Sequence, residues 1–189
     1  MVRSGLPDHR PAPTLRPAAT ILFAGPLGTG AGIAADVFAD VARLSHRKVA
    51  RRRDFMNVAA SLNGGAKPGV LQFVAFGDPA RSVDLAKVDV VIAWDQTSAA
   101  AVRASGIKAA EWIVVDPASS PSVVPNWRRD LLADVAKAGQ VTATPLQQTA
   151  RALKAVSRRT PFARELWQRV LKLHVPVRKR RAVAAEFAA

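Results

Sequence analysis

Glycines gather between residues 19 and 42 at a spacing that could place backbone N–H groups around an anion. The apolar run at 20–24 enters a loop with Gly25, Gly28, Thr29 and Gly30, and a helix-like segment follows. The N-terminus of a helix offers free N–H groups and the positive end of the helix dipole. These four loop residues are therefore candidate ligand contacts. Close packing of strand and helix is the alternative explanation for the glycines.

The loop departs from the familiar nucleotide-binding patterns. A dinucleotide fingerprint reads G-x-G-x-x-G, with an acidic residue about 20 positions further on. Here Leu27 takes the place of the second glycine, and the basic run at 46–53 follows the helix. Gly30 is followed by alanine and glycine, which excludes a Walker-type phosphate loop. Arg51–Arg53 could favour a 2′-phosphate, so a stand-alone nucleotide-binding or NAD(P)-binding protein remains an alternative.

Carboxylates and histidines add little further chemistry. Asp95 and Asp116 each follow an expected strand, where functional residues of α/β folds gather, and Asp95 joins the candidate ligand contacts. Capping and turn formation explain these two carboxylates equally well. The three histidines stand apart in the sequence, and there is no cysteine. We therefore expect no catalytic residue and no metal site in this chain.

Strand-like and helix-like patterns alternate along the chain. Asn63, Gly64 and Gly65 separate two strand-like runs and predict a β-hairpin. The alternation predicts an α/β fold, a Rossmann-like three-layer sandwich whose mainly parallel sheet carries one antiparallel hairpin. Expected strands lie at 20–24, 54–62, 70–76, 88–94, 111–115 and 140–143, and expected helices at 31–44, 97–102, 127–136, 145–156 and 162–173.

Charge and composition divide the chain into four expected segments. They are a flexible arm at 1–18, the α/β domain at 19–157, a helix at 158–175 and a basic flexible tail at 176–189. The formal net charge is +14, and residues 151–189 carry 11 Lys/Arg against two acids. Such a tail suits an acidic protein surface or nucleic acid, so a basic scaffold protein is a second alternative.

No apolar run approaches the roughly 20 residues that span a bilayer, and residues 1–18 lack the apolar core of a secretory signal. We therefore expect no transmembrane segment. Together with the absence of cysteine, this favours a cytoplasmic protein.

The order of these segments resembles the gamma subunit, or gamma domain, of 2-oxoacid:ferredoxin oxidoreductases of the pyruvate and indolepyruvate type. The family's G-x-G-G-Q-G loop is matched by 25–30, with Leu27 and Thr29 at a glycine and a glutamine position. Its Arg-Gly-Gly turn is matched by 63–65, with Asn63 in place of the arginine. Its D-V-hydrophobic-I-A strand is matched by 89–93, and Asp95 follows.

The resemblance implies a role without catalysis by this chain alone. In such complexes thiamine diphosphate sits between other subunits, and iron–sulfur clusters lie on cysteine-bearing ones. The complex decarboxylates a 2-oxoacid oxidatively with coenzyme A. We expect the chain to bind none of these cofactors alone and to shape the coenzyme A side and the subunit interface. Its partners would be the catalytic subunits. The interface residues would be the turn Asn63, Gly64 and Gly65 and the tail residues Arg178, Lys179, Arg180 and Arg181.

Overall fold

The chain forms one sheet with helices packed on it. The computed structural model describes residues 15, 17–58, 67–77, 83–116 and 145–188. In chain order the elements are β1 (Ala19–Pro26), α1 (Ala31–Leu44), β2 (Lys48–Val58), β3 (Lys67–Gly77), β4 (Lys87–Asp95), α2 (Gln96–Ala104), β5 (Lys108–Asp116), α4 (Pro145–Ser157), α5 (Arg164–His174), the 3-10 helix η2 (Val177–Lys179) and α6 (Arg180–Ala188).

The five strands lie in the order β2-β3-β1-β4-β5. β4 pairs in parallel with β1 and with β5, whereas β3 runs antiparallel to both β1 and β2. Four strands therefore share one direction and only β3 is reversed. The expected mainly parallel sheet with one antiparallel hairpin, formed by β2 and β3, is confirmed. The turn of that hairpin lies outside the described residues, as do the segments expected at 127–136 and 140–143.

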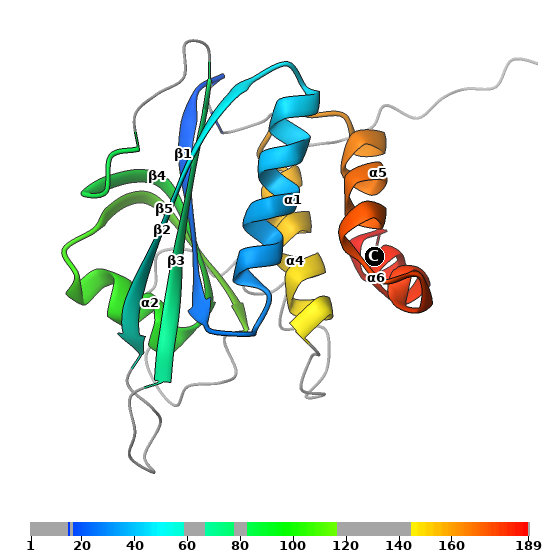
Figure 1. Cartoon of the computed structure of the whole chain (residues 1–189). Coiled ribbons are helices and arrows are strands. Elements are labelled where there is room, and N and C mark those ends of the chain that lie inside the picture. The colour runs from blue at the N-terminus through cyan, green and yellow to red at the C-terminus, as the bar shows by residue number, and fades with distance from the viewer. Residues whose placement is uncertain (1–14, 16, 59–66, 78–82, 117–144, 189) are drawn as a thin grey trace, which may run out of the picture.

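Helices cover both faces of the sheet, which confirms the three-layer α/β sandwich. Figure 1 shows α2 on one face and α1 and α4 on the other, with α5 and α6 further out. Side chains alternate along β1 accordingly. Ile21 and Phe23 belong to the core cluster beneath α1, and Leu22 and Ala24 belong to the cluster beneath α2.

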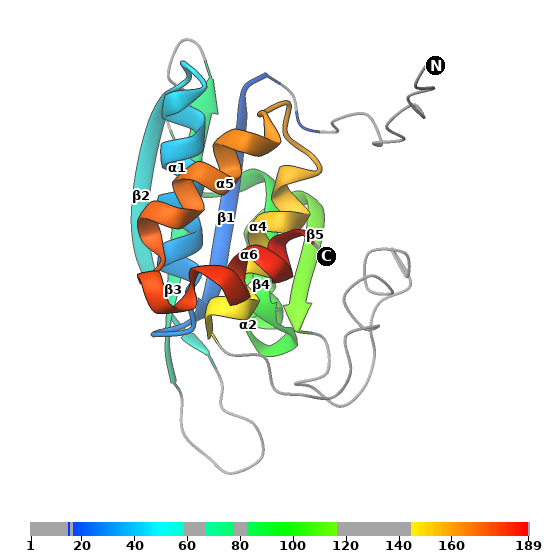
Figure 2. The same ribbon diagram turned by 90° about the vertical axis from the view of Figure 1, so that its right-hand side faces the viewer.

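The outer helices are held to the inner ones by an aromatic cluster. Phe38 of α1 lies 5.5 Å from Phe76 of β3 and 5.9 Å from Trp167 of α5, measured between ring centroids. Figure 2 shows α5 lying across α1, and α6 across α4. The buried face of α1 is centred on Phe38, whereas Leu44 at the end of the helix is 52% exposed.

The basic run at 46–53 is mostly strand. The expected strand at 54–62 instead begins at Lys48, and β2 pairs with β3 from Lys48↔Gly77 to Val58↔Lys67. This strand lies at the edge of the sheet, where charged side chains can reach water and hinder pairing with another chain. Charge therefore obscured the strand in the sequence.

The C-terminal segment differs from the expected flexible tail. Residues 177–188 form η2 and α6, and Val183 and Phe187 of α6 are buried in the same core cluster as α1 and α4. The Phe187 ring stacks on Trp167 at 6.4 Å, and Arg151 of α4 forms an ion pair with Glu186 at 2.6 Å. This helix was not predicted from the short apolar stretch after the basic run. Val183 and Phe187 are four residues apart, so they share one face of α6 and pack it against the core.

The helix layer is also joined to the sheet by a buried ion pair. Arg159, which follows α4, donates from Nε to Glu111 Oε1 of β5 at 2.7 Å, and both side chains are nearly buried. Its Nη1 donates to the carbonyl oxygen of Ala155 at 2.6 Å. None of the described helices is both long enough and apolar enough to cross a membrane.

Candidate functional site

The N-termini of three helices lie at the carboxyl edge of the sheet. α1 follows β1 after a short loop, and α2 follows β4 without any loop. α4 begins beside Gly30, because Thr149 Oγ1 lies 3.4 Å from the Gly30 carbonyl oxygen. The same hydroxyl donates to the carbonyl oxygen of Pro145 at 2.7 Å. This edge carries the glycine loop and Asp95, so the structure brings these candidates together, as expected for an α/β sheet.

The loop between β1 and α1 is held by contacts within the protein. Thr29 donates to the carbonyl oxygen of Pro26 from Oγ1 at 2.6 Å and from its backbone N at 3.2 Å. The buried Trp94 donates from Nε1 to the carbonyl oxygen of Thr29 at 2.7 Å. The polar groups of Thr29 are thus engaged by the loop itself and by β4. The sequence pattern did not predict this bond, which joins residues 65 positions apart.

The loop glycines meet different surroundings. A Cβ at Gly25 would lie 3.0 Å from both Thr29 Oγ1 and Trp94 Cβ. A Cβ at Gly30, where φ is +101°, would lie 2.1 Å from Thr149 Oγ1. Gly28 has φ +85° with open space around it. Close packing therefore requires glycine at Gly30 and favours it at Gly25, whereas Gly28 serves the turn.

Asp95 caps α2. Its Oδ1 accepts a hydrogen bond from the backbone N of Ser98 at 2.6 Å, the geometry of an N-cap aspartate. α1 differs, because its N-cap is Gly30 and no side chain caps it. Asp95 is the register partner of Asp116 at the ends of β4 and β5, although the Asp116 side chain lies outside the described residues.

At the other end of α2, Arg103 stacks over the Trp112 ring at 4.5 Å. Burial lowers the pKa of the Arg103 guanidinium from its ordinary value, and the group still remains protonated near neutral pH. This contact joins α2 to β5, and we assign it a role in packing.

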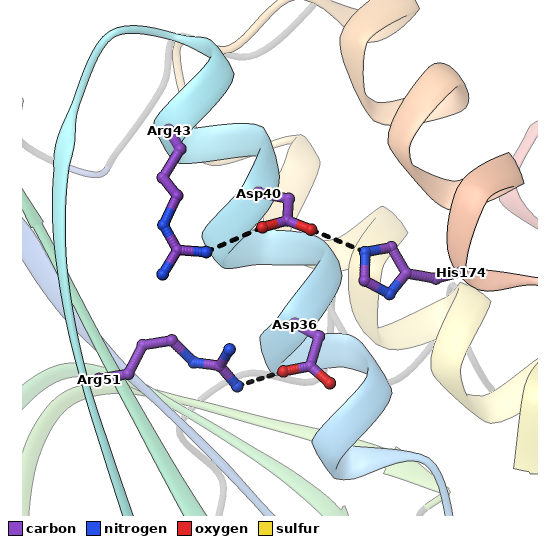
Figure 3. A network of polar contacts seen from close by, with 5 residues as sticks. All are labelled: Asp36, Asp40, Arg43, Arg51 and His174. Carbon is purple, nitrogen blue, oxygen red and sulfur yellow. Dashed lines mark hydrogen bonds and ion pairs between the residues drawn. The ribbon is translucent and has the colours of Figure 1, made fainter.

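Two carboxylates of α1 form a separate polar network (Figure 3). Asp40 bonds Arg43 at 2.9 Å and His174 of α5 at 2.9 Å. Asp36 pairs with Arg51 of β2. The network thus ties α1 to β2 on one side and to α5 on the other. Its members are partly exposed, so each pair contributes at most about 1 kcal/mol.

The remaining candidates lie elsewhere or outside the described residues. The turn at 63–65 is not among the described residues. Arg178 and Lys179 belong to η2, and Arg180 and Arg181 begin α6, which contacts α4. Among the described residues, no group of three or more His, Cys, Asp or Glu could hold a metal ion.

Comparison with known proteins rests on structure. No protein-family model matches the chain, and no curated protein matches it in sequence. The gamma subunit of a keto/oxoacid ferredoxin oxidoreductase from Geobacter sulfurreducens is similar over 90% of this chain and 96% of its own, with a TM-score of 0.50 and 16% identity. A pyruvate oxidoreductase subunit from Thermotoga maritima is similar over 90% of this chain and 96% of its own, with a TM-score of 0.54 and 13% identity.

A larger protein also contains this fold. The 2-oxoglutarate:ferredoxin oxidoreductase from Magnetococcus marinus, solved with 2-oxoglutarate, coenzyme A and succinyl-CoA bound, is similar over 92% of this chain but only 30% of its own, with a TM-score of 0.61 and 17% identity. The resemblance seen in the order of the sequence motifs is therefore confirmed for the fold: this chain resembles the gamma subunits of 2-oxoacid:ferredoxin oxidoreductases in structure.

Proposed function

We propose that this chain is a non-catalytic, gamma-like subunit of a 2-oxoacid oxidoreductase complex. The observation that carries the proposal is a structural likeness extending over nine-tenths of the chain and nearly all of a solved gamma subunit. In this proposal other subunits hold thiamine diphosphate and the iron–sulfur clusters. They perform the oxidative decarboxylation of the 2-oxoacid with coenzyme A.

The chemistry of the glycine loop supports a structural role. Thr29 and the Oδ1 atom of Asp95 form hydrogen bonds within the chain, and the space beside Gly30 is filled by α4. Contacts of this kind favour a loop that presents a rigid surface to a partner over one that takes part in proton transfer. Its contribution to the complex would be to shape the coenzyme A side and the neighbouring interface.

Exposed apolar side chains mark the part of this edge that we assign to the partner subunit. Leu27, in the loop, is 60% exposed, and Phe55 of β2 is 66% exposed. Phe55 pairs in register with Val70 of β3, which in turn pairs with Gly25 of β1. Since neighbouring strands are about 4.8 Å apart, Phe55 stands roughly 10 Å from the start of the loop. Large apolar residues at such a spacing suit the core of a protein interface.

Substitution of these residues tests the proposal. We expect the native chain to co-elute with candidate catalytic subunits in size-exclusion chromatography, with their stoichiometry given by native mass spectrometry. Leu27→Asp and Phe55→Asp should each abolish co-elution without changing the urea unfolding midpoint. The matched control is Leu173→Asp on α5, because Leu173 is 73% exposed and lies in the outer helix layer. The control should bind normally.

Two results would contradict the proposal. A chain that remains monomeric beside folded candidate subunits removes the assigned function. Normal binding of both edge variants together with loss of binding by Leu173→Asp moves the interface to the helix layer.

The structure gives the nucleotide-binding alternative little support. Arg51 is paired with Asp36, and Arg53 donates from Nε to the side-chain oxygen of Gln72 at 2.6 Å in the amide orientation that satisfies both groups. Two of the three arginines expected to seat a 2′-phosphate, Arg51 and Arg53, are therefore engaged within the chain. A thermal-shift screen should accordingly show no stabilisation by NAD, NADP or ATP.

A further inference from the structure

The outermost helices form a partly open cavity that the proposed function does not use. It has a volume of about 340 Å³ and lies between α5 and α6. Its apolar wall is formed by Leu171, Val175, Val183 and Phe187, each no more than 5% exposed. Ligand-binding pockets in proteins usually fall between about 300 and 1,000 Å³ and are lined mainly by apolar side chains. The cavity is thus of a size and character that suits a small apolar group.

Two cationic side chains also line this cavity. Arg180 is positioned by a bond from its Nε to the carbonyl oxygen of Val175 at 3.2 Å. Its two terminal nitrogens have no acceptor among the described residues, nor does the ammonium of Lys172. A guanidinium held at Nε presents its remaining N–H groups in a fixed direction, which suits a carboxylate.

The segments that line the cavity are rich in basic residues and poor in acidic ones. No acidic residue lies between Glu165 and Glu186 in the sequence, a stretch that includes the basic run at 178–181. Glu186, the acid closest along α6, is engaged by Arg151 of α4 at 2.6 Å. A ligand with one apolar end and one negatively charged end would therefore match both the apolar wall and the two cations.

We propose that this cavity binds a small amphipathic carboxylate. The apolar end of the ligand lies against Leu171, Val183 and Phe187, and its carboxylate accepts hydrogen bonds from Arg180 and Lys172. A neutral apolar molecule would accept no charge-assisted hydrogen bond from the two cations, and a hydrophilic anion would make no use of the apolar wall. The site is separate from the glycine loop and from the subunit contacts assigned to Leu27 and Phe55.

Octanoate is a suitable probe, titrated by calorimetry into the full chain without partner subunits. Octanol and octylamine have the same apolar chain but a neutral or a cationic head group. We expect saturable one-to-one binding of octanoate, at least about tenfold weaker binding of octanol, since charge-assisted hydrogen bonds exceed neutral ones, and no binding of octylamine. Binding should also alter tryptophan fluorescence, because the Phe187 ring in the wall stacks on Trp167.

Variants locate the site. Arg180→Gln and Lys172→Gln should each weaken octanoate binding about tenfold or more, because each removes a charged donor. The matched control is Arg178→Gln with Lys179→Gln, which removes basic residues of the same segment that do not line the cavity. The control should bind octanoate as the native chain does. Should Arg180→Gln unfold α6, as judged by circular dichroism, Lys172→Gln and the octanol comparison still test the proposal.

Three results would overturn it. They are the absence of saturable octanoate binding at millimolar concentration, equal affinity for octanoate and octanol, and equal losses in the lining and control variants. The last result would indicate attraction to the basic segment in general rather than binding in the cavity. None of these outcomes depends on whether the chain joins an oxidoreductase complex.

Discussion

Gly30→Ala tests the idea that the glycine loop is built for close packing. A Cβ at this position would lie 2.1 Å from Thr149 Oγ1 and 2.9 Å from the carbonyl oxygen of Pro145, and the φ of +101° is unfavourable for alanine. Gly28→Ala is the matched control, because its φ is +85° and its surroundings are open. Both substitutions bring backbone strain, but only Gly30→Ala also brings steric overlap.

The expected magnitudes follow from these two contributions. A left-handed conformation costs a non-glycine residue roughly 1–2 kcal/mol, so Gly28→Ala should lower the free energy of unfolding by about that much. Overpacking adds roughly 1–3 kcal/mol, which places Gly30→Ala at about 2–5 kcal/mol. The entropy lost from the unfolded chain is the same for both substitutions and cancels in the comparison.

The measurement is urea denaturation of the purified chain, followed by circular dichroism. Thr149→Ala provides a second test, since it removes the oxygen nearest to the added Cβ. In a double-mutant cycle, Thr149→Ala should recover about 1 kcal/mol or more of the loss caused by Gly30→Ala. The reasoning is refuted if Gly30→Ala is no more destabilising than Gly28→Ala, since α4 would then not fill the space beside the loop.

Three further predictions concern other contacts. Glu111→Ala leaves Arg159 nearly buried without its carboxylate partner, so it should lower the free energy of unfolding by about 3 kcal/mol or more in the same assay. Arg43→Gln breaks a half-exposed pair and should cost under about 1 kcal/mol; equal losses would contradict the assigned burial. Asp95→Ala removes the cap of α2 and should cost about 1 kcal/mol, whereas Asp95→Asn should retain most of the stability. Equal destabilisation by the alanine and asparagine variants would show that the cap bond contributes little.

Much of the fold can be predicted from the sequence, because the boundaries of its elements depend on residues that are close together in the chain. The apolar run before Gly25, the capping carboxylate at Asp95 and the proline at Pro145 each indicate an element boundary, and the structure begins or ends an element within a few residues of each. The order of these elements is enough to predict the sandwich and the family resemblance. The start of β2 was predicted too late, because the basic residues at 46–53 are not typical of a strand. An edge strand tolerates such charged side chains.

The candidate site was only partly predictable. The sequence placed Gly25, Gly28, Thr29, Gly30 and Asp95 at one sheet edge, because loops that follow neighbouring parallel strands meet there. It left their use undecided between ligand contact and packing. The bond from Trp94 to the Thr29 carbonyl oxygen, and the pair formed by Glu111 and Arg159, join residues 65 and 48 positions apart. No spacing rule within one element links such partners.

The sequence by itself determined the α/β class, the order of the elements, the position of the glycine loop and the positive charge of the C-terminal region. Each depends on neighbours along the chain: hydrophobic period, caps, turn residues and composition. Only the tertiary structure decided that Thr149, 119 residues away, occupies the space beside Gly30, and that Val183 and Phe187 fix the basic tail as a helix with a cavity beneath it. Packing of side chains distant in sequence decides these features, because whether a space is filled depends on shapes that meet only after the chain has folded.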